Sequence, residues 1–276
     1  MTTATPVRSI DTSGTARVPF LRLVSVEWRK MLDTRGGFWL LAVTGALVVL
    51  CFALTILVVA LNDGFSVSAG MISEIFTIPL SLLLPVLAIL IVTSEWSQRS
   101  HMVTFTLEPS RMRVMLAKLA AVTVLSLLTI VFAFVMGALT NVICAAILDA
   151  NASWNLDAGE IAWLVVLQLI YMLMGFGIAA LFLNTPASIA VYYVASLLLP
   201  LMVYSILVAI FDWARELIPF IDITYAVTPF QQGTDMMGQP VDTGVVDVLR
   251  VITSMLLWVV GPIVLGFSRV LRSELK

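Results

Sequence analysis

The stretch FWLLAVTGALVVLCFALTILVVAL, residues Phe38–Leu61, contains no Asp, Glu, Lys, Arg or His. A helix of about 20 mainly apolar residues crosses the roughly 30 Å hydrocarbon core of a bilayer, so this stretch is long enough to span a membrane. It is longer than the apolar core of a signal peptide, and no small-residue cleavage site is evident. We therefore expect a transmembrane helix here.

Five further runs of the same kind follow in the 276 residues, at Ile75–Thr93, Leu119–Leu148, Ile161–Leu183, Ser188–Phe211 and Val251–Ser268. The composition agrees, because 61% of the residues are hydrophobic and 12% are charged, against about 25% charged residues in soluble domains. We predict an all-α membrane protein with six transmembrane helices. The third run is too long for one perpendicular crossing, so we expect it to tilt, to project beyond the bilayer or to break near Gly137.

The positions of the basic residues predict the orientation. If the six runs cross the membrane in turn, every Lys and Arg except Arg215 and Arg250 lies on the same side. Cytoplasmic segments of membrane proteins are enriched in Lys and Arg. Both termini are therefore predicted to be cytoplasmic.

Two regions precede the first run. Residues 1–18 are rich in Thr, Ser and Ala and lack an apolar period, so we expect a disordered tail. Residues 19–37 place apolar and polar side chains on opposite faces of a helix, which favours an amphipathic helix in the membrane interface and a turn at residues 35–37. Glu27 falls on the apolar face, so we expect it to meet a basic group. The alternative for this segment is a simple juxtamembrane anchor.

Residues 94–113 form a long cytoplasmic segment with mixed charge and apolar side chains. We expect a short helix from Glu95 to about Thr104, and a new helix that begins after Pro109 with Ser110 as its N-cap. A tether between two spans needs only a few residues. The length and composition of this segment therefore favour docking to a cytoplasmic partner, with a solvated connector as the alternative.

The segment at 212–247 is too apolar for a free outer loop. Pro219 and Pro229 are expected to divide it into pieces too short to span, which suits two short re-entrant helices whose backbone is buried by protein. An outer helix lying on lipid is the alternative.

The sequence contains no sign of a catalytic domain. The longest segment outside the runs, Asp212–Arg250, is shorter than most domains that fold alone. None of the three lysines follows a glycine, so there is no P-loop for ATP. The chain has one histidine and no convincing metal site, so we expect no cofactor and no enzymatic activity in this chain.

With these residues in view, the chain resembles the permease subunit of a type-two ABC exporter. Glu27-Trp28-Arg29-Lys30 matches the Glu-x-x-Lys element of that family's elbow helix. After the second span the family has a Glu, then a Thr, then Pro-x-Arg and a Lys. In this chain they are matched by Glu95, Thr104, Pro109-Ser110-Arg111 and Lys118. One departure is Val103, which stands where the family often has Gly.

The resemblance implies an assembly in a bacterial inner (plasma) membrane. The segment after the second span would form a coupling helix in a groove of the ATPase subunit, and short re-entrant helices would precede the last span. The implied partners are two cytoplasmic ATPase subunits that carry ATP and Mg, a second permease that is identical or a sister, and membrane lipid, with no nucleic acid. The residues implied in coupling are Glu95, Gln98, Arg99, His101, Thr104, Phe105, Glu108, Pro109, Arg111, Arg113 and Lys118.

Polar side chains within the spans are sparse and form the candidate substrate path: Asn141, Gln168, Tyr171, Tyr192, Tyr193 and Tyr204. Hydrogen bonds between helices are the alternative explanation for each of them. The absence of charge from the six runs favours a hydrophobic or amphipathic cargo, such as a drug, a peptide antibiotic or a lipid-like molecule.

Other functions remain open at this stage. A sensor or immunity component that works with an ATPase without transport would share these features. An ion-coupled transporter is disfavoured because it usually needs an ionisable group within the membrane. A membrane enzyme is disfavoured because it needs a nucleophile with a base, or metal ligands.

Overall fold

A computed structural model describes residues 18–62, 67–98, 110–235 and 237–272. The predicted disordered tail, except for Val18, lies outside these residues. Within the described ranges the regular structure is helical, and no β-strand is present. The prediction of an all-α fold is confirmed for this part of the chain.

Six of the helical stretches are long and apolar enough to cross a membrane, as predicted. Each covers most or all of one of the predicted runs. Four are simple α-helices: α2 (Arg35–Leu61), α3 (Ala69–Ser97), α5 (Arg111–Ile147) and α6 (Ala158–Phe182). The other two contain a π-helical segment: α7 (Thr185–Tyr193), η1 (Val194–Tyr204) and α8 (Ser205–Ile210), then α11 (Val245–Met255), η2 (Leu256–Val260) and α12 (Gly261–Arg272).

Helix α5 runs without interruption for 37 residues, so a break near Gly137, one of the three alternatives for this run, is excluded. One glycine costs a helix only about 1 kcal/mol, and the apolar residues on either side continue the helix. Gly137 is buried against α3, where a Cβ would lie 3.4 Å from Cγ2 of Ile72, an ordinary contact distance. At about 1.5 Å per residue the helix is roughly 55 Å long, longer than the hydrocarbon core of a bilayer. The two alternatives that remain are a tilted helix and a helix that projects beyond the bilayer.

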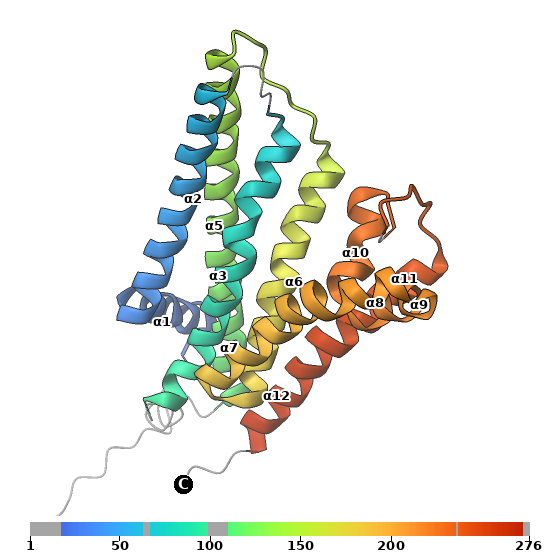
Figure 1. Ribbon diagram of the computed structural model, residues 1–276. Coiled ribbons are helices and arrows are strands. Elements are labelled where there is room, and N and C mark those ends of the chain that lie inside the picture. Colours follow the sequence, from blue (N-terminus) through green and yellow to red (C-terminus); the bar gives the residue numbers. More distant parts are fainter. Residues whose placement is uncertain (1–17, 63–66, 99–109, 236, 273–276) are drawn as a thin grey trace, which may run out of the picture.

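Helices α3 and α6 form the centre of the bundle, with α5 and α12 packed against them (Figure 1). Small residues bring the backbones close together, as is typical of membrane helices. A Cβ at Gly175 of α6 would lie 2.7 Å from the backbone oxygen of Pro85 in α3. A Cβ at Gly266 of α12 would lie 2.6 Å from Cβ of Ala180 in α6.

Tyrosine hydroxyls support α3 at its second proline. Pro85 has no N–H, so the carbonyl of Ser81 one turn earlier loses its helical partner. The hydroxyl of Tyr192 on α7 donates a 3.2 Å hydrogen bond to this carbonyl, and the hydroxyl of Tyr193 donates one of 2.8 Å to that of Leu82. A neighbouring helix therefore supplies the donor that Pro85 lacks.

Helix α1 (Phe20–Asp33) lies across the end of the bundle where the C-terminal end of α12 is also found (Figure 1). The expected turn at residues 35–37 is wrong, because α2 already begins at Arg35. Thr34 makes the turn in an extended conformation, and its hydroxyl oxygen accepts a hydrogen bond from N–H of Gly37 at 3.3 Å. Thr34 is therefore the C-cap of α1 and also the N-cap of α2. Its side chain caps the start of α2.

Two short helices, α9 (Asp212–Ile221) and α10 (Ile223–Gln232), precede the last long helix. The pair itself is confirmed, but the expected breaks at the prolines are wrong, since Pro219 lies inside α9 and Pro229 inside α10. The break is at Asp222, whose backbone is extended and whose carboxylate accepts a 3.1 Å hydrogen bond from N–H of Tyr225. An internal proline removes one helical hydrogen bond, whereas an aspartate N-cap satisfies a free N–H and starts a new helix.

Candidate functional site

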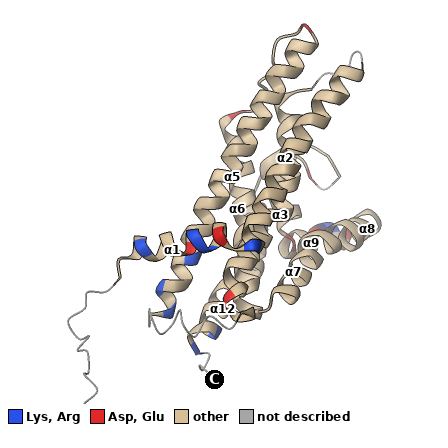
Figure 2. Ribbon diagram, turned by 90° about the vertical axis from the view of Figure 1, so that its left-hand side faces the viewer, with Lys and Arg blue, Asp and Glu red and all other residues tan. Residues whose placement is uncertain are grey.

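Four charged side chains from three helices meet at the end of the bundle that carries α1. Nζ of Lys30 lies 2.7 Å from Oε1 of both Glu27 and Glu95. Nζ of Lys118 lies 2.7 Å from Oε2 of Glu27 and 3.1 Å from Oε1 of Glu95. Red and blue segments stand side by side there, where α1 crosses the bundle (Figure 2). We call these four residues the charge cluster.

The charge cluster is buried and electrically balanced. Glu27, Glu95 and Lys118 are buried, and the side chain of Lys30 is 38% exposed. Lys118 also donates a 3.2 Å hydrogen bond to the carbonyl of Ile91. Buried charges are unfavourable unless they are paired, so the two carboxylates and the two ammonium groups stabilise one another. The prediction that Glu27 meets a basic group is confirmed.

The pKa of Lys30 reflects this arrangement. Burial alone would lower the pKa of its ammonium group, and this is the largest single influence. The carboxylates of Glu27 and Glu95 together outweigh it and raise the pKa above its ordinary value. Lys30 therefore stays charged throughout the physiological range.

The charge cluster joins α1 to both ends of the predicted coupling segment. Glu95 lies in the last turn of α3, and Lys118 lies in the second turn of α5. The expectation that Glu95 begins a separate short helix is wrong, because α3 continues to Ser97. The apolar run ends at Thr93, but none of the next four residues is a helix breaker.

Two arginines at the start of α5 hold neighbouring segments. Nη1 of Arg111 donates a 2.9 Å hydrogen bond to the carbonyl of Val270 near the end of α12, and Arg113 donates one to the carbonyl of Val18. These bonds tie the first turn of α5 to the end of the last helix and to the segment before α1. As predicted, α5 begins directly after Ser110, which occupies the N-cap position.

The remaining predicted residues of this region are placed as follows. Gln98 is the exposed C-cap of α3, and its N–H bonds the carbonyl of Ser94. Trp28 packs against the core from α1, and Arg29 is exposed. Six predicted coupling residues lie outside the described residues: Arg99, His101, Thr104, Phe105, Glu108 and Pro109.

A cavity of about 660 Å³ borders the charge cluster between α1, the start of α2, α3 and α5. Its lining combines the charged groups with apolar and small residues, including Met31, Gly37, Leu87 and Val114. The end of the bundle is therefore not tightly packed around the charge cluster.

The six residues of the predicted substrate path do not share one surface. Tyr192 and Tyr193 contact carbonyls of α3, as described above. The hydroxyl of Tyr171 on α6 lies 2.9 Å from Oγ1 of Thr224 on α10. Tyr204 packs with Val208, Ala214 and Ile218 in a small separate cluster. For Tyr192, Tyr193 and Tyr171, hydrogen bonds to a neighbouring helix account for the hydroxyl group.

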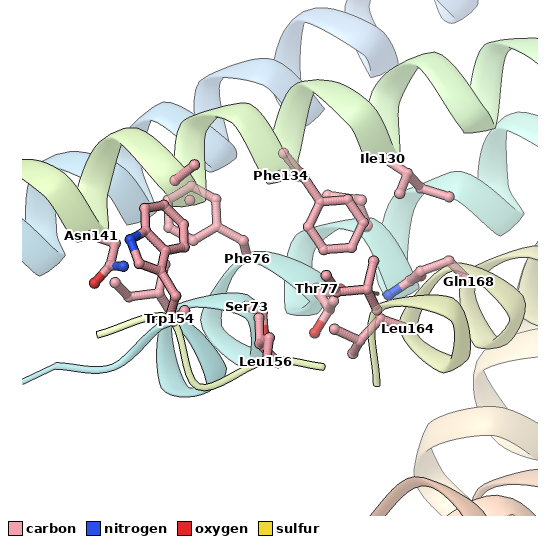
Figure 3. A pocket seen from close by; sticks show the side chains of 17 residues that line it. Ser73, Phe76, Thr77, Ile130, Phe134, Asn141, Trp154, Leu156, Leu164 and Gln168 are labelled. Carbon is pink, nitrogen blue, oxygen red and sulfur yellow. Dashed lines mark hydrogen bonds between the residues drawn. The ribbon is translucent and has the colours of Figure 1, made fainter. Parts of the chain in front are cut away.

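Asn141 and Gln168 line a second pocket, of about 360 Å³, between α3, α5, α6 and the segment that joins α5 to α6 (Figure 3). The sequence did not indicate this pocket, because most of its lining residues are apolar and resemble ordinary core positions. Trp154 was the one available signal, since it is a large aromatic residue in a predicted outer loop.

The described residues contain no group of three or more His, Cys, Asp and Glu side chains that could hold a metal ion. No model of a known protein family matches the chain, and no curated protein matches it.

Proposed function

We propose that this chain is the membrane subunit of an ATP-driven exporter of hydrophobic or amphipathic molecules, powered by separate ATPase subunits bound at the cytoplasmic end. The observation that supports this proposal best is the charge cluster. A force applied to the segment between Gln98 and Ser110 would reach α3 through its last turn and α5 through its first turn. Because Glu95 and Lys118 are both joined to α1, the three helices would move together.

The distribution of buried surface supports a second permease. Helices α2, α7–α8 and α11–α12 are much less buried within the chain than α3 and α6. Large apolar faces on a membrane protein are covered by lipid or by another subunit. We propose that two copies, or this chain and a sister, form the translocation path between such faces in a bacterial inner membrane, with both termini cytoplasmic and α9–α10 re-entrant.

Co-purification tests the central claim. The tagged chain, extracted in mild detergent from its native membrane, is expected to retain an ATP-hydrolysing protein. Arg99→Glu, within the predicted coupling segment, is expected to reduce the retained ATPase at least tenfold. Arg22→Glu provides the matched control, because Arg22 is exposed on α1. If both variants retain the ATPase, or if the unmodified chain retains none, the proposal is contradicted.

Transport is tested with the complex reconstituted in liposomes. A panel of hydrophobic and amphipathic compounds is expected to stimulate ATP hydrolysis, and the active compounds should accumulate on the side opposite the ATPase. If the ATPase co-purifies but no compound is moved, the result favours a sensor or immunity component over a permease.

A further inference from the structure

The pocket between α3, α5 and α6 contains a buried acceptor without a partner. Gln168 on α6 is 3% exposed. Its Nε2 donates a 3.2 Å hydrogen bond to the carbonyl of Thr77 on α3, whereas its Oε1 has no hydrogen-bond partner among the described residues. Buried polar atoms in proteins are nearly always paired, so this oxygen requires an explanation.

The orientation of this amide follows from its neighbour. A backbone carbonyl can only accept a hydrogen bond, so the nitrogen of Gln168 has to face Thr77. Rotating the amide by 180° would place two acceptors against each other. Oε1, which is itself buried, is therefore the end of the amide that lacks a hydrogen-bond partner among the described residues.

The remaining lining defines what the pocket can hold. It is dominated by hydrocarbon and aromatic side chains such as Phe76, Ile130, Phe134 and Leu164, and none of its lining residues is ionisable. A charged ligand would lose its hydration without gaining a counter-charge. The volume of about 360 Å³ is in the range of small-molecule pockets.

The segment that connects α5 to α6 forms one wall of the pocket, and hydrogen bonds hold this segment in place. The carbonyl of Ser153 accepts hydrogen bonds from N–H of Ala69 at 3.1 Å and from Nδ2 of Asn141 at 3.0 Å. Oδ1 of Asn155 accepts one from N–H of Gly70 at 3.0 Å. These bonds place Trp154 beside Asn141 at one end of the pocket, while Gln168 lies at the other (Figure 3).

We propose that this pocket binds an uncharged, apolar small molecule that donates one hydrogen bond, from a hydroxyl or an N–H group, to Oε1 of Gln168. The site lies within a single copy of the chain and does not depend on the proposed transport function. The donor of the ligand sits at the Gln168 end, and its apolar body extends toward Trp154.

A matched pair of probes tests the site. In 8-bromooctan-1-ol the hydroxyl can reach Gln168 while the bromine lies near Trp154 and quenches its fluorescence, whereas 1-bromooctane lacks the donor. The full chain is reconstituted in phosphatidylcholine nanodiscs, and the signal of Trp154 is isolated by subtracting that of Trp154→Phe. With both concentrations expressed per lipid in the bilayer, the alcohol is expected to reach half-maximal quenching of Trp154 at a roughly fivefold lower concentration than 1-bromooctane, as one added hydrogen bond predicts.

Two variants complete the test. Gln168→Leu has a similar volume but no acceptor, so it should abolish the preference for the alcohol while the chain stays folded. Ala138→Phe places a ring in the pocket from α5 and should reduce quenching by both probes. Equal quenching by the two probes in the unmodified chain, or a preference for the alcohol that survives in Gln168→Leu, would overturn the proposal.

Discussion

Lys118 and Glu27 are 91 positions apart in the sequence, and Nζ of Lys118 lies 2.7 Å from Oε2 of Glu27. This buried ion pair joins α1 to α5, and Lys30 and Glu95 extend it into the charge cluster. Because each ammonium group contacts both carboxylates, no single member can be removed without leaving an unbalanced buried charge.

Replacing Glu27 by Gln is therefore expected to destabilise the protein by about 3–5 kcal/mol, since Lys118 then keeps its charge with one partner fewer. The midpoint of thermal unfolding in a fixed detergent measures the effect. Arg22→Gln, an exposed change on the same helix, should lie within about 0.5 kcal/mol of the unmodified chain.

The double variant Glu27→Gln with Lys118→Met separates charge balance from simple loss of contacts. It leaves the pair Lys30–Glu95, at 2.7 Å, and restores neutrality. Its destabilisation should be smaller than the sum of the two single changes. Strict additivity would show that Glu27 and Lys118 do not stabilise one another.

Much of this arrangement could be predicted from single segments of sequence. The six spans were predictable because each apolar run is uninterrupted, and Glu27 stood out because a carboxylate on an apolar face needs a cation. The identity of its main partner was not predictable. Lys118 comes just before a long apolar run, and only the packing of α1 against α5 brings the two residues together.

Local sequence features predict the structure wrongly where tertiary packing decides the outcome. The prolines at 219 and 229 were expected to end helices, but a helix tolerates one missing hydrogen bond, and the N-cap at Asp222 sets the boundary. The pocket at Gln168 could not be predicted, since an unpaired amide oxygen depends on which carbonyl its nitrogen meets. The candidate coupling residues between 99 and 109 stay predictions.

Close packing between α6 and α12 depends on Gly266. In Gly266→Ala the new methyl group would lie 2.6 Å from Cβ of Ala180, so α12 has to shift. Overpacking of this kind costs about 1–3 kcal/mol. Gly45→Ala is the matched control, because a Cβ there meets nothing within 4 Å and alanine favours helix by up to about 1 kcal/mol. Thermal unfolding should therefore move in opposite directions in the two variants.

Asp222 is expected to make stability depend on pH. Burial is the main cause that raises the pKa of its carboxyl group to about 6 from an ordinary value of 3.8, and the N–H donors of the following turn act against it. The folded protein thus binds this proton more tightly than the unfolded chain does. The resulting stabilisation is complete below about pH 4 and is lost as the pH rises through 6, with a total of roughly 3 kcal/mol.

Asp222→Asn isolates this contribution, because asparagine keeps the N-cap of α10 but does not titrate. Thermal unfolding of the variant should lack the change between pH 4 and 6 and should occur at a higher temperature than that of the unmodified chain at pH 7. Asp212→Asn is the control, since that side chain is 95% exposed, and should leave the change intact. An identical pH profile in Asp222→Asn would show that another group titrates there.

The hydrogen bonds around Pro85 of α3 give a last prediction. Tyr192→Phe removes the donor to the carbonyl of Ser81, which Pro85 has already deprived of its helical partner, and should cost about 0.6–2 kcal/mol. Tyr193→Phe is the matched comparison and should cost less, because the carbonyl of Leu82 can still accept from N–H of Val86 in the same helix. In a Pro85→Ala background the backbone N–H returns to the carbonyl of Ser81, so the two Tyr→Phe changes should become equivalent in thermal unfolding. A cost of Tyr192→Phe that is the same with Pro85 and with Ala at this position would mean that the hydroxyl does not compensate for the N–H that Pro85 lacks.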